Sequence, residues 1–379
     1  MKLFKPAAKL EQSEYDEKVA TGLDRAFKSA GTRDVQLAQL RLVILSDLHR
    51  GARDGADDFQ RCEPAYSAAL GWYLERGYQL YLLGDVEELW ENDIGEVLPR
   101  YADCMKLEKA FMDGPGLTRF FGNHDIDWRD AGKVETHLAP LLPGIEVLEA
   151  LKLRVLDGDA QLGQLFLVHG HQGTDLSDRG AGLSRLVLRV VWRQIQNHLG
   201  WLSTTPASDY DLRAKHDVAM FRWSRRAALA APADERAAMI AGHTHHPVFP
   251  DHPPPAPGPG DPSALQSELD KARARGAGVD ELAPLHAELE RLRAIGRRAP
   301  YTPPAIDPPT YFNTGCCCFP DRDVTGLEIA DGKVTLVRWL NDEGQARPKE
   351  LAPPIALTDL FARLRAAGEI DREPPRTGA

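Results

Sequence analysis

Five short apolar runs in this sequence are each followed directly by carboxylate, amide or imidazole side chains, often with a glycine at the junction. Such runs are typical of buried strands, and the helical patterns between them favour a layered α/β fold. The carboxyl ends of strands in α/β sheets meet in one crevice, so residues distant in sequence can converge there. The five segments are Ser46-Asp47-Leu48-His49, Gly84-Asp85, Gly122-Asn123-His124-Asp125, His169-Gly170-His171 and Gly242-His243-Thr244-His245-His246.

Each of these segments alone is also explained by an ordinary turn or a solvated polar loop. Together they supply oxygen and nitrogen ligands without thiolate, a set that suits manganese, iron, zinc or cobalt better than calcium. Two ions about 3.5–4 Å apart need one carboxylate between them and further ligands on either side, and the segments contain candidates for both. We therefore expect two divalent metal ions, with manganese as the first choice.

The remaining apolar patterns place these segments in an alternation of strands and helices. Continuous apolar strands that alternate with helices favour sheets with covered faces. We expect strands at about 40–46, 78–83, 118–121, 144–148, 151–156, 164–168, 237–241, 311–313, 324–330 and 333–340, and helices at about 63–76 and 101–112.

Composition divides the chain into a core with two helical insertions. Prolines flank the second insertion, and proline-flanked charged helices are typical of a stiff surface arm. The expected parts are an N-terminal helical segment 1–38, a core 39–249 with a helical cap insertion at about 181–237, a proline-flanked helical arm 250–309, C-terminal core strands 310–345 and a C-terminal tail or helix 346–379. The insertions could also mediate formation of an oligomer.

One helix of the cap insertion, at about 183–199, carries a stripe of arginines. At about 100° per residue, Arg185, Arg189 and Arg193 fall within an arc of roughly 80°. Under one interpretation this is a core helix that shows its arginines to water. Under the other it caps the crevice, and the guanidinium groups bind substrate phosphate or carboxylate. His171 is a further candidate for substrate binding.

Charge and cysteine content exclude several classes of protein. With 46 Lys and Arg against 56 Asp and Glu, the net charge of -10 argues against bulk binding of nucleic acid, although bound metal would still allow a phosphate substrate. Five cysteines, three of them consecutive at 316–318, imply no disulfide framework, and we expect plain buried thiols because strand neighbours face opposite ways. Without a run of about 18 apolar residues or a signal segment, we expect no transmembrane segment and a cytoplasmic protein.

In order, the five segments resemble the motifs of calcineurin-like metallophosphoesterases, which are D-x-H, G-D-x-x-D/E, G-N-H-D/E, H and G-H-x-H. The resemblance covers about 41–246, and Asn313-Thr314-Gly315 resembles the family's last core strand. It implies a four-layer α/β/β/α sandwich of two mixed sheets with helices outside. Residues 84–90 and Pro247 resemble the branch that hydrolyses UDP-2,3-diacylglucosamine. That branch usually has Arg where this chain has His124, and HGD where it has His169-Gly170-His171, which leaves the substrate open.

Carried over residue by residue, the resemblance implies a role for each ligand-type side chain. One metal ion would be held by Asp47, His49 and His245, the other by Asn123, His169 and His243, with Asp85 bridging them. His124 would face the scissile phosphate, oriented by Glu88.

These roles imply hydrolysis of a phosphoester or pyrophosphate bond by a metal-bridging hydroxide, with a phosphorylated small molecule or nucleotide as substrate. The alternative is a non-catalytic metal-binding scaffold that binds a protein partner through its helical arm, and loss of ligands would favour it. A nuclease of the same fold would need a basic groove interleaved with aromatic residues, which the sequence does not show.

Overall fold

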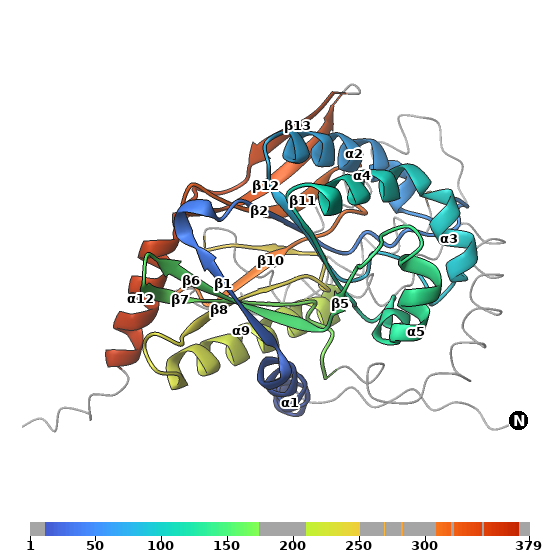
Figure 1. Ribbon diagram of the computed structural model, residues 1–379. Coiled ribbons are helices and arrows are strands. Elements are labelled where there is room, and N and C mark those ends of the chain that lie inside the picture. The colour runs from blue at the N-terminus through green and yellow to red at the C-terminus, as the bar shows by residue number, and fades with distance from the viewer. Residues whose placement is uncertain are drawn as a thin grey trace, which may run out of the picture.

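The computed structural model describes residues 12–173, 210–250, 269, 282, 308–319, 322–342 and 345–370. These residues form two mixed β-sheets that pack face to face, with helices on their outer faces (Figure 1). The arrangement confirms the prediction of a mixed α/β sandwich. None of the described helices is long and apolar enough to cross a membrane.

The first sheet, sheet A, has the strand order β1-β6-β7-β8-β10-β9. Strands β7, β8 and β10 are parallel to one another, and β6 runs antiparallel to β7. The strands are β1 Gly31–Gln36, β6 Ala150–Asp157, β7 Ala160–Val168, β8 Ala237–Ala241, β9 Pro247–Val248 and β10 Tyr311–Thr314.

The second sheet, sheet B, has the order β13-β12-β11-β2-β3-β4-β5, and β14 pairs with β12. Strands β2 to β5 are parallel, whereas β11 to β14 add an antiparallel half. The strands are β2 Leu42–Leu45, β3 Gln79–Leu83, β4 Leu117–Phe120, β5 Val147–Leu148, β11 Val324–Ala330, β12 Lys333–Asp342, β13 Gln345–Glu350 and β14 Ile355–Ala356.

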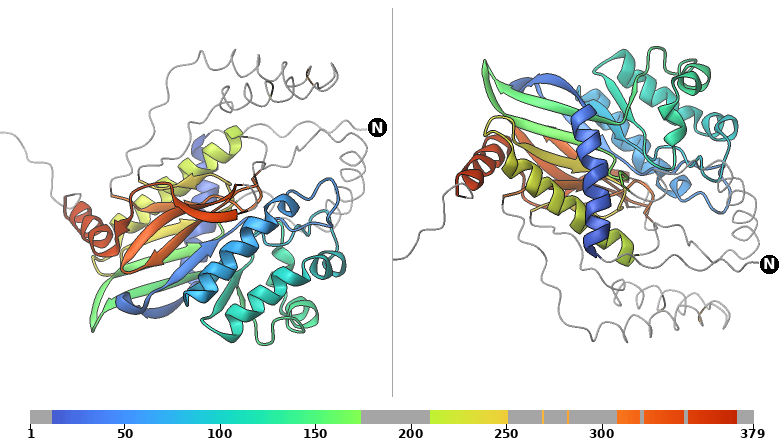
Figure 2. Two further views of the ribbon diagram at one scale, coloured as in Figure 1. Left: turned by 90° about the horizontal axis from the view of Figure 1, so that it is seen from above. Right: turned by 90° about the horizontal axis from the view of Figure 1, so that it is seen from below.

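Helices cover the outer faces of both sheets (Figure 2). Helices α1 and α9 pack side by side against sheet A, and α2 and α4 pack against sheet B. The helices are α1 Gln12–Ser29, α2 Phe59–Glu75, α3 Ile94–Arg100, α4 Ala102–Asp113, α5 Ala131–Lys133, α9 Tyr210–Ala230 and α12 Leu357–Ile370, with short turns η1 Leu37–Gln39, η2 Ile126–Arg129 and η3 Val134–Leu138.

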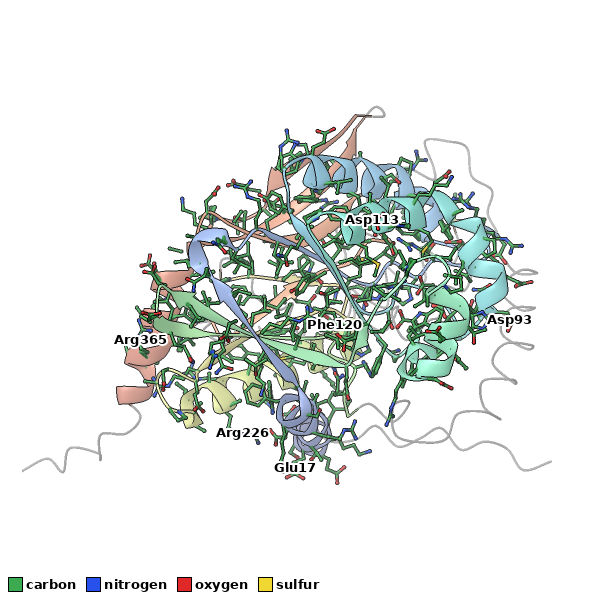
Figure 3. All side chains as sticks on the ribbon, viewed as in Figure 1. Glu17, Asp93, Asp113, Phe120, Arg226 and Arg365 are labelled. Atoms are coloured by element: carbon green, nitrogen blue, oxygen red, sulfur yellow. The ribbon has the colours of Figure 1, made fainter. Side chains whose placement is uncertain are left out.

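Apolar side chains fill the space between the two sheets and the space under the helices on each side. The inner cluster joins Ile44 and Phe120 of sheet B to Leu167 and Ile240 of sheet A. In Figure 3, Phe120 lies among the interior side chains, whereas Glu17 and Arg226 lie at the periphery. Because both faces of β2 and β8 are covered, the sequences of these two strands are continuous apolar runs.

Two expectations about the outer parts of the chain are wrong in their detail. The segment 1–38 is not purely helical, since Gly31–Gln36 forms strand β1 and pairs in parallel with β6. Helix α1 before it belongs to the core, because Val19 and Leu23 are fully buried against sheet A. The alternating apolar pattern that marks a strand is weak in β1, which lies at the edge of its sheet.

The expected cap insertion at 181–237 contains a helix of the core instead. Helix α9 packs on sheet A and on α1, and its Met220 and Trp223 are buried there. Arg185, Arg189 and Arg193 lie outside the described residues, as does the expected arm 250–309 except for residues 250, 269, 282, 308 and 309. The expected tail 346–379 includes most of strand β13, strand β14 and helix α12, so the core strands extend past the expected boundary at 345.

Candidate metal centre

The predicted ligand side chains come together where strands of both sheets end. Asp47 and His49 follow β2, Asp85 follows β3, and Asn123 follows β4, three neighbouring parallel strands of sheet B. His169, His243 and His245 follow β7 and β8, parallel neighbours in sheet A. The convergence predicted from the strand-end pattern is therefore present in the fold.

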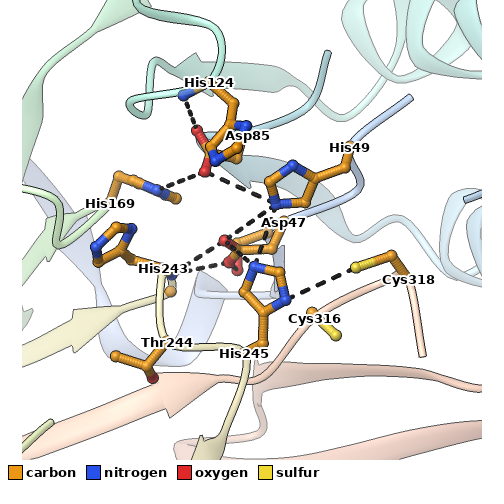
Figure 4. Close-up of polar contacts among 12 residues, drawn as sticks. Asp47, His49, Asp85, His124, His169, His243, Thr244, His245, Cys316 and Cys318 are labelled. Atoms are coloured by element: carbon orange, nitrogen blue, oxygen red, sulfur yellow. Dashed lines mark hydrogen bonds and ion pairs between the residues drawn. The ribbon is translucent and has the colours of Figure 1, made fainter. Parts of the chain in front are cut away.

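Asp47, His49 and His245 form the first ligand group (Figure 4). The Nε2 atoms of His49 and His245 lie 3.1 Å apart, and Asp47 Oδ1 lies 3.3 Å from His245 Nε2. Two imidazole nitrogens at this distance need a proton or a cation between them. The first ligand group therefore could hold a metal ion.

Asp85, His169 and His243 form the second ligand group, next to the first. Asp85 Oδ2 lies 3.2 Å from His169 Nε2 and 3.8 Å from His49 Nε2 of the first group. The other carboxylate oxygen, Oδ1, accepts a hydrogen bond of 2.8 Å from the backbone N–H of His124. This bond fixes the carboxylate with Oδ2 between the two groups.

One buried oxygen beside these groups, Asn123 Oδ1, accepts no hydrogen bond from the described residues, and Asn123 is only 6% exposed. A buried acceptor without a donor is costly, and coordination of a cation satisfies it. The donor chemistry of the site therefore fits a metal ion.

The other ring nitrogens of two ligand histidines are held by fixed acceptors. His169 Nδ1 lies 2.8 Å from the carbonyl oxygen of Leu83, and His49 Nδ1 lies 3.0 Å from Glu88 Oε2. An Nδ1–H that donates to such an acceptor leaves Nε2 as the lone-pair atom. In both rings, Nε2 is the atom that faces the ligand groups.

The backbone at the ligand groups lies in a sparsely populated conformation. Eight non-glycine residues of the described chain have positive φ, and five of them belong to these groups. The five, with φ from 50° to 70°, are Asp47, His49, Asp85, His243 and His245. Each such residue costs of order 1–3 kcal/mol, and clusters of them are typical of functional sites.

Two motif glycines are required by close packing at the centre. A Cβ atom at Gly122 would lie closer than 3.0 Å to Asp85 and to His169, and one at Gly242 would lie equally close to Ser46 and Asp47. Both positions therefore admit only glycine while the ligand side chains stay in place. This explains the glycine in two of the strand-end motifs.

His124 and Glu88 form a pair at the edge of the centre. His124 Nδ1 lies 2.6 Å from Glu88 Oε2, the oxygen that also contacts His49. The Trp90 ring stacks on the His124 ring with 4.1 Å between centroids and 19° between planes. Burial opposes ionisation of Glu88, but His124 and then His49 lower its pKa to about 2. The His124 ring is therefore held in one orientation by an ionised carboxylate.

The charges of the ligands depend on each other. Burial would raise the pKa of Asp47, but His245 and His169 hold it well below its usual range. Burial likewise opposes protonation of His169, but Asp85 and Asp47 raise its pKa to about 9. The pKa of His243 is lowered, chiefly by burial and then by His216 and His169. The carboxylates of Asp47 and Asp85 are therefore negatively charged and attract cations.

A buried ion network supports the loop after β3 and was not predicted from the sequence. Glu87, next to Glu88, accepts hydrogen bonds from Arg119 at 2.6 and 2.8 Å and from Trp128 Nε1 at 2.8 Å. Arg50 pairs with Glu108 at the same place, and all four charged side chains are at most 1% exposed. The sequence does not indicate which of the two adjacent residues, Glu87 or Glu88, joins the buried ion network and which one contacts His124.

The segment after β10 supports the histidines of the last motif. Asn313 Nδ2 donates to the carbonyl oxygen of Gly242 at 2.7 Å, and Ser46 Oγ lies 2.6 Å from Thr314 Oγ1. Asp217 of α9 accepts from Thr244 Oγ1 at 2.8 Å and from Tyr311 OH at 2.7 Å. Asp217 was missed by the sequence reasoning, because only the fold brings α9 to this loop.

His171 lies beside the second ligand group rather than in it. Its ring centroid is 5.4 Å from that of His169 and 6.5 Å from that of His243. Burial, and then the neighbouring His169, lower the pKa of His171 to about 3. The neutral, buried His171 ring therefore packs beside His169. A role of His171 in substrate binding stays a prediction.

The cysteines at 316–318 are not all plain buried thiols, contrary to the expectation from the sequence. Cys318 is partly exposed, and its Sγ lies 3.8 Å from His245 Nδ1. Together Cys316, Cys318 and His245 form a further group whose ligand-type atoms lie within 4.8 Å of one another. Residues two apart share a side even in a regular strand, and the bend of the chain at Cys317 brings the Cys316 and Cys318 side chains close together.

Comparison of the whole chain with protein-family models and with curated proteins gave no match.

Proposed function

We propose that this protein is a dinuclear metal-dependent hydrolase of phosphoester or pyrophosphate bonds, with the four-layer fold of calcineurin-like metallophosphoesterases. The observation that carries the proposal is the position of Asp85 Oδ2, 3.2 Å from His169 Nε2 and 3.8 Å from His49 Nε2. A carboxylate between two groups of ligands is the arrangement that a pair of metal ions needs. Under this proposal Asp85 would be a ligand of both ions, and Asn123 would complete the second group through its Oδ1.

The ligand set is suited to manganese, with iron, zinc or cobalt as alternatives. Two such cations would supply a nucleophile from water near neutral pH and would offset the charge of the phosphoryl oxygens. The chain's own contribution is to fix the ligands in advance. The hydrogen bonds from His169 Nδ1 to Leu83 and from His49 Nδ1 to Glu88 keep each Nε2 directed to the site.

His124 is the residue that would handle a proton during hydrolysis. In the imidazolium form its Nδ1–H donates to ionised Glu88, and its Nε2–H is then the proton that would be donated to the oxygen of the leaving group. The stacked Trp90 ring restrains rotation of His124. A phosphorylated small molecule or a nucleotide is the class of substrate that this chemistry fits.

The test is a metal titration of the full-length chain combined with a substrate panel. After removal of metal by a chelator, added manganese should bind at about two ions per chain. It should also restore hydrolysis of at least one of a phosphomonoester, a phosphodiester and a nucleotide pyrophosphate. A protein that binds no manganese would contradict the proposal. A protein that binds two ions and hydrolyses none of the three classes would instead support the scaffold alternative.

Substitution of His124 separates chemistry from metal binding. His124→Ala should lower turnover by about 10²–10⁴-fold, the usual contribution of a general acid, and should retain both ions. His137→Ala, which changes a histidine in η3 away from the ligand groups, is the matched control. Loss of metal in His124→Ala would make His124 a ligand and not a proton donor.

A further inference from the structure

The three consecutive cysteines that follow β10 lie in different surroundings. Cys317 is fully buried in the apolar cluster between sheet B and its helices. Cys316 is 2% exposed, and Cys318 is partly exposed. Because the chain bends at Cys317, the Sγ atoms of Cys316 and Cys318 come within 4.8 Å of each other and of a ring nitrogen of His245. Cys316 and Cys318 are therefore a thiol pair, separate from the core cysteine between them.

This thiol pair contacts the first ligand group at two points. Cys318 Sγ lies 3.8 Å from His245 Nδ1, the ring nitrogen on the side away from His49 (Figure 4). The backbone N–H of Cys317 donates to the carbonyl oxygen of Asp47 at 3.1 Å. Two of the three residues of the first group, Asp47 and His245, thus contact residues 316–318. Asp85 and His169 of the second group are instead hydrogen-bonded to His124 and Leu83.

We propose that Cys316 and Cys318 are a reversible oxidation site that controls metal binding at the first ligand group. In the first step, one thiolate of the pair attacks a hydroperoxide, breaks its O–O bond and, with one proton taken up, becomes a sulfenic acid with release of water or an alcohol. The other thiol then attacks that sulfur, forms the S–S bond and releases water. Two thiols lose two electrons, and the peroxide gains them. A dithiol reverses the reaction by thiol–disulfide exchange.

The disulfide acts on His245 through the atom that faces the thiols. With Nε2 directed to the site, Nδ1 carries the proton, and the Cys318 sulfur is its acceptor. Forming the S–S bond draws this sulfur toward Cys316 and makes it a poorer acceptor. Loss of the partner of a ligating histidine typically lowers metal affinity by about 10–100-fold. We expect this loss for one ion only. The hydrogen bonds that hold Asp85 and His169 in the second group come from His124 and Leu83 and not from the cysteines.

Formation of the bond is tested first, without reference to metal. The full chain is reduced with a dithiol, treated with hydrogen peroxide, and digested, and the mass of the peptide that spans 316–318 is measured. We expect the loss of two hydrogen atoms, reversed by the dithiol, in wild type and in the control Cys104→Ala, and no such loss in Cys316→Ser. Wild type that instead accumulates sulfinic acid, or keeps both thiols, would overturn the proposal.

The expected effect of the disulfide on metal binding rests on the proposed function. Manganese titration shows whether the proposed function or the oxidation site fails. In wild type, oxidation should weaken one of the two ions by about 10–100-fold and lower turnover, and dithiol should restore both. In the double variant Cys316→Ser/Cys318→Ser, which has neither thiol of the pair, the ratio of oxidised to reduced turnover should be close to one. Reduced wild type that binds no manganese would refute the proposed function. Reduced wild type with two ions, both of which survive disulfide formation at unchanged affinity, would refute the oxidation site alone.

Discussion

Glu88→Gln tests whether one carboxylate links the proposed proton donor to the first ligand group. Glu88 Oε2 lies 2.6 Å from His124 Nδ1 and 3.0 Å from His49 Nδ1, so the change acts on both rings. Glutamine keeps the shape of the side chain and one acceptor oxygen. The substitution therefore removes the charge of Glu88 with little change in packing.

The magnitude follows from the pKa of Glu88, which the two histidines lower from 4.5 to about 2 against the effect of burial. At about 1.4 kcal/mol per pKa unit, the net lowering, after the opposing effect of burial, favours the ionised carboxylate by about 3 kcal/mol, or a factor of about 300. That interaction is shared between His124 and His49. We therefore expect kcat/KM to fall by up to about 300-fold, with part of the loss arising from weaker metal binding.

The assay is kcat/KM measured over a range of manganese concentrations. Saturating manganese should remove the part of the loss that arises from His49, and the remaining loss reports on His124. Glu135→Gln, which changes an exposed carboxylate in η3, controls for the loss of one negative charge. A Glu88→Gln protein with unchanged kcat/KM at every manganese concentration would refute the reasoning.

Three shorter predictions concern the bridge, the pH dependence and the buried network. Asp85→Asn should weaken both ions together, and two ions retained with normal turnover would contradict the bridge. Without metal, protonated His169 stabilises the folded state; this stabilisation is complete below about pH 6.5 and disappears as the pH rises through about 9. Because the proton competes with the metal ion, manganese affinity should rise between these pH values, and an affinity that does not change with pH would contradict this prediction. Glu87→Gln should lower the free energy of unfolding in denaturant by about 3–5 kcal/mol, because Arg119 stays buried and charged, and added Arg119→Met should recover part of the loss.

The sequence predicts the parts of this fold in which local pattern and burial agree. Strands β2 and β8, and β3 after Gln79, are continuous apolar runs because both faces of each are covered, and their ends carry ligand residues. The motif glycines Gly122 and Gly242 are also visible in the sequence, and the structure adds the physical reason that a Cβ atom would strike Asp85 or Asp47.

The features that the sequence does not predict depend on tertiary contacts. Helix α9 has an interior face only because α1 and sheet A cover it, and its Asp217 reaches Thr244 across the fold. Glu87 and Glu88 are neighbours of the same type with different partners, Arg119 for one and His124 for the other. Partner choice of this kind is set by the direction of each side chain in a loop, which residue spacing does not determine.

The conformation of the centre also predicts how removal of metal affects stability. Five ligand residues with positive φ cost of order 1–3 kcal/mol each, a sum of about 5–15 kcal/mol that is comparable to the net stability of a whole domain. Asn123 Oδ1, buried without a donor among the described residues, adds to this cost. Bound cations would offset both costs, because ligation stabilises the folded state over the unfolded one. We therefore expect a chelator to lower the thermal midpoint by more than about 5 °C, measured by calorimetry, and readdition of manganese to restore it. An unchanged midpoint would mean that hydrogen bonds within the chain already stabilise this conformation and that the strain has no relation to metal.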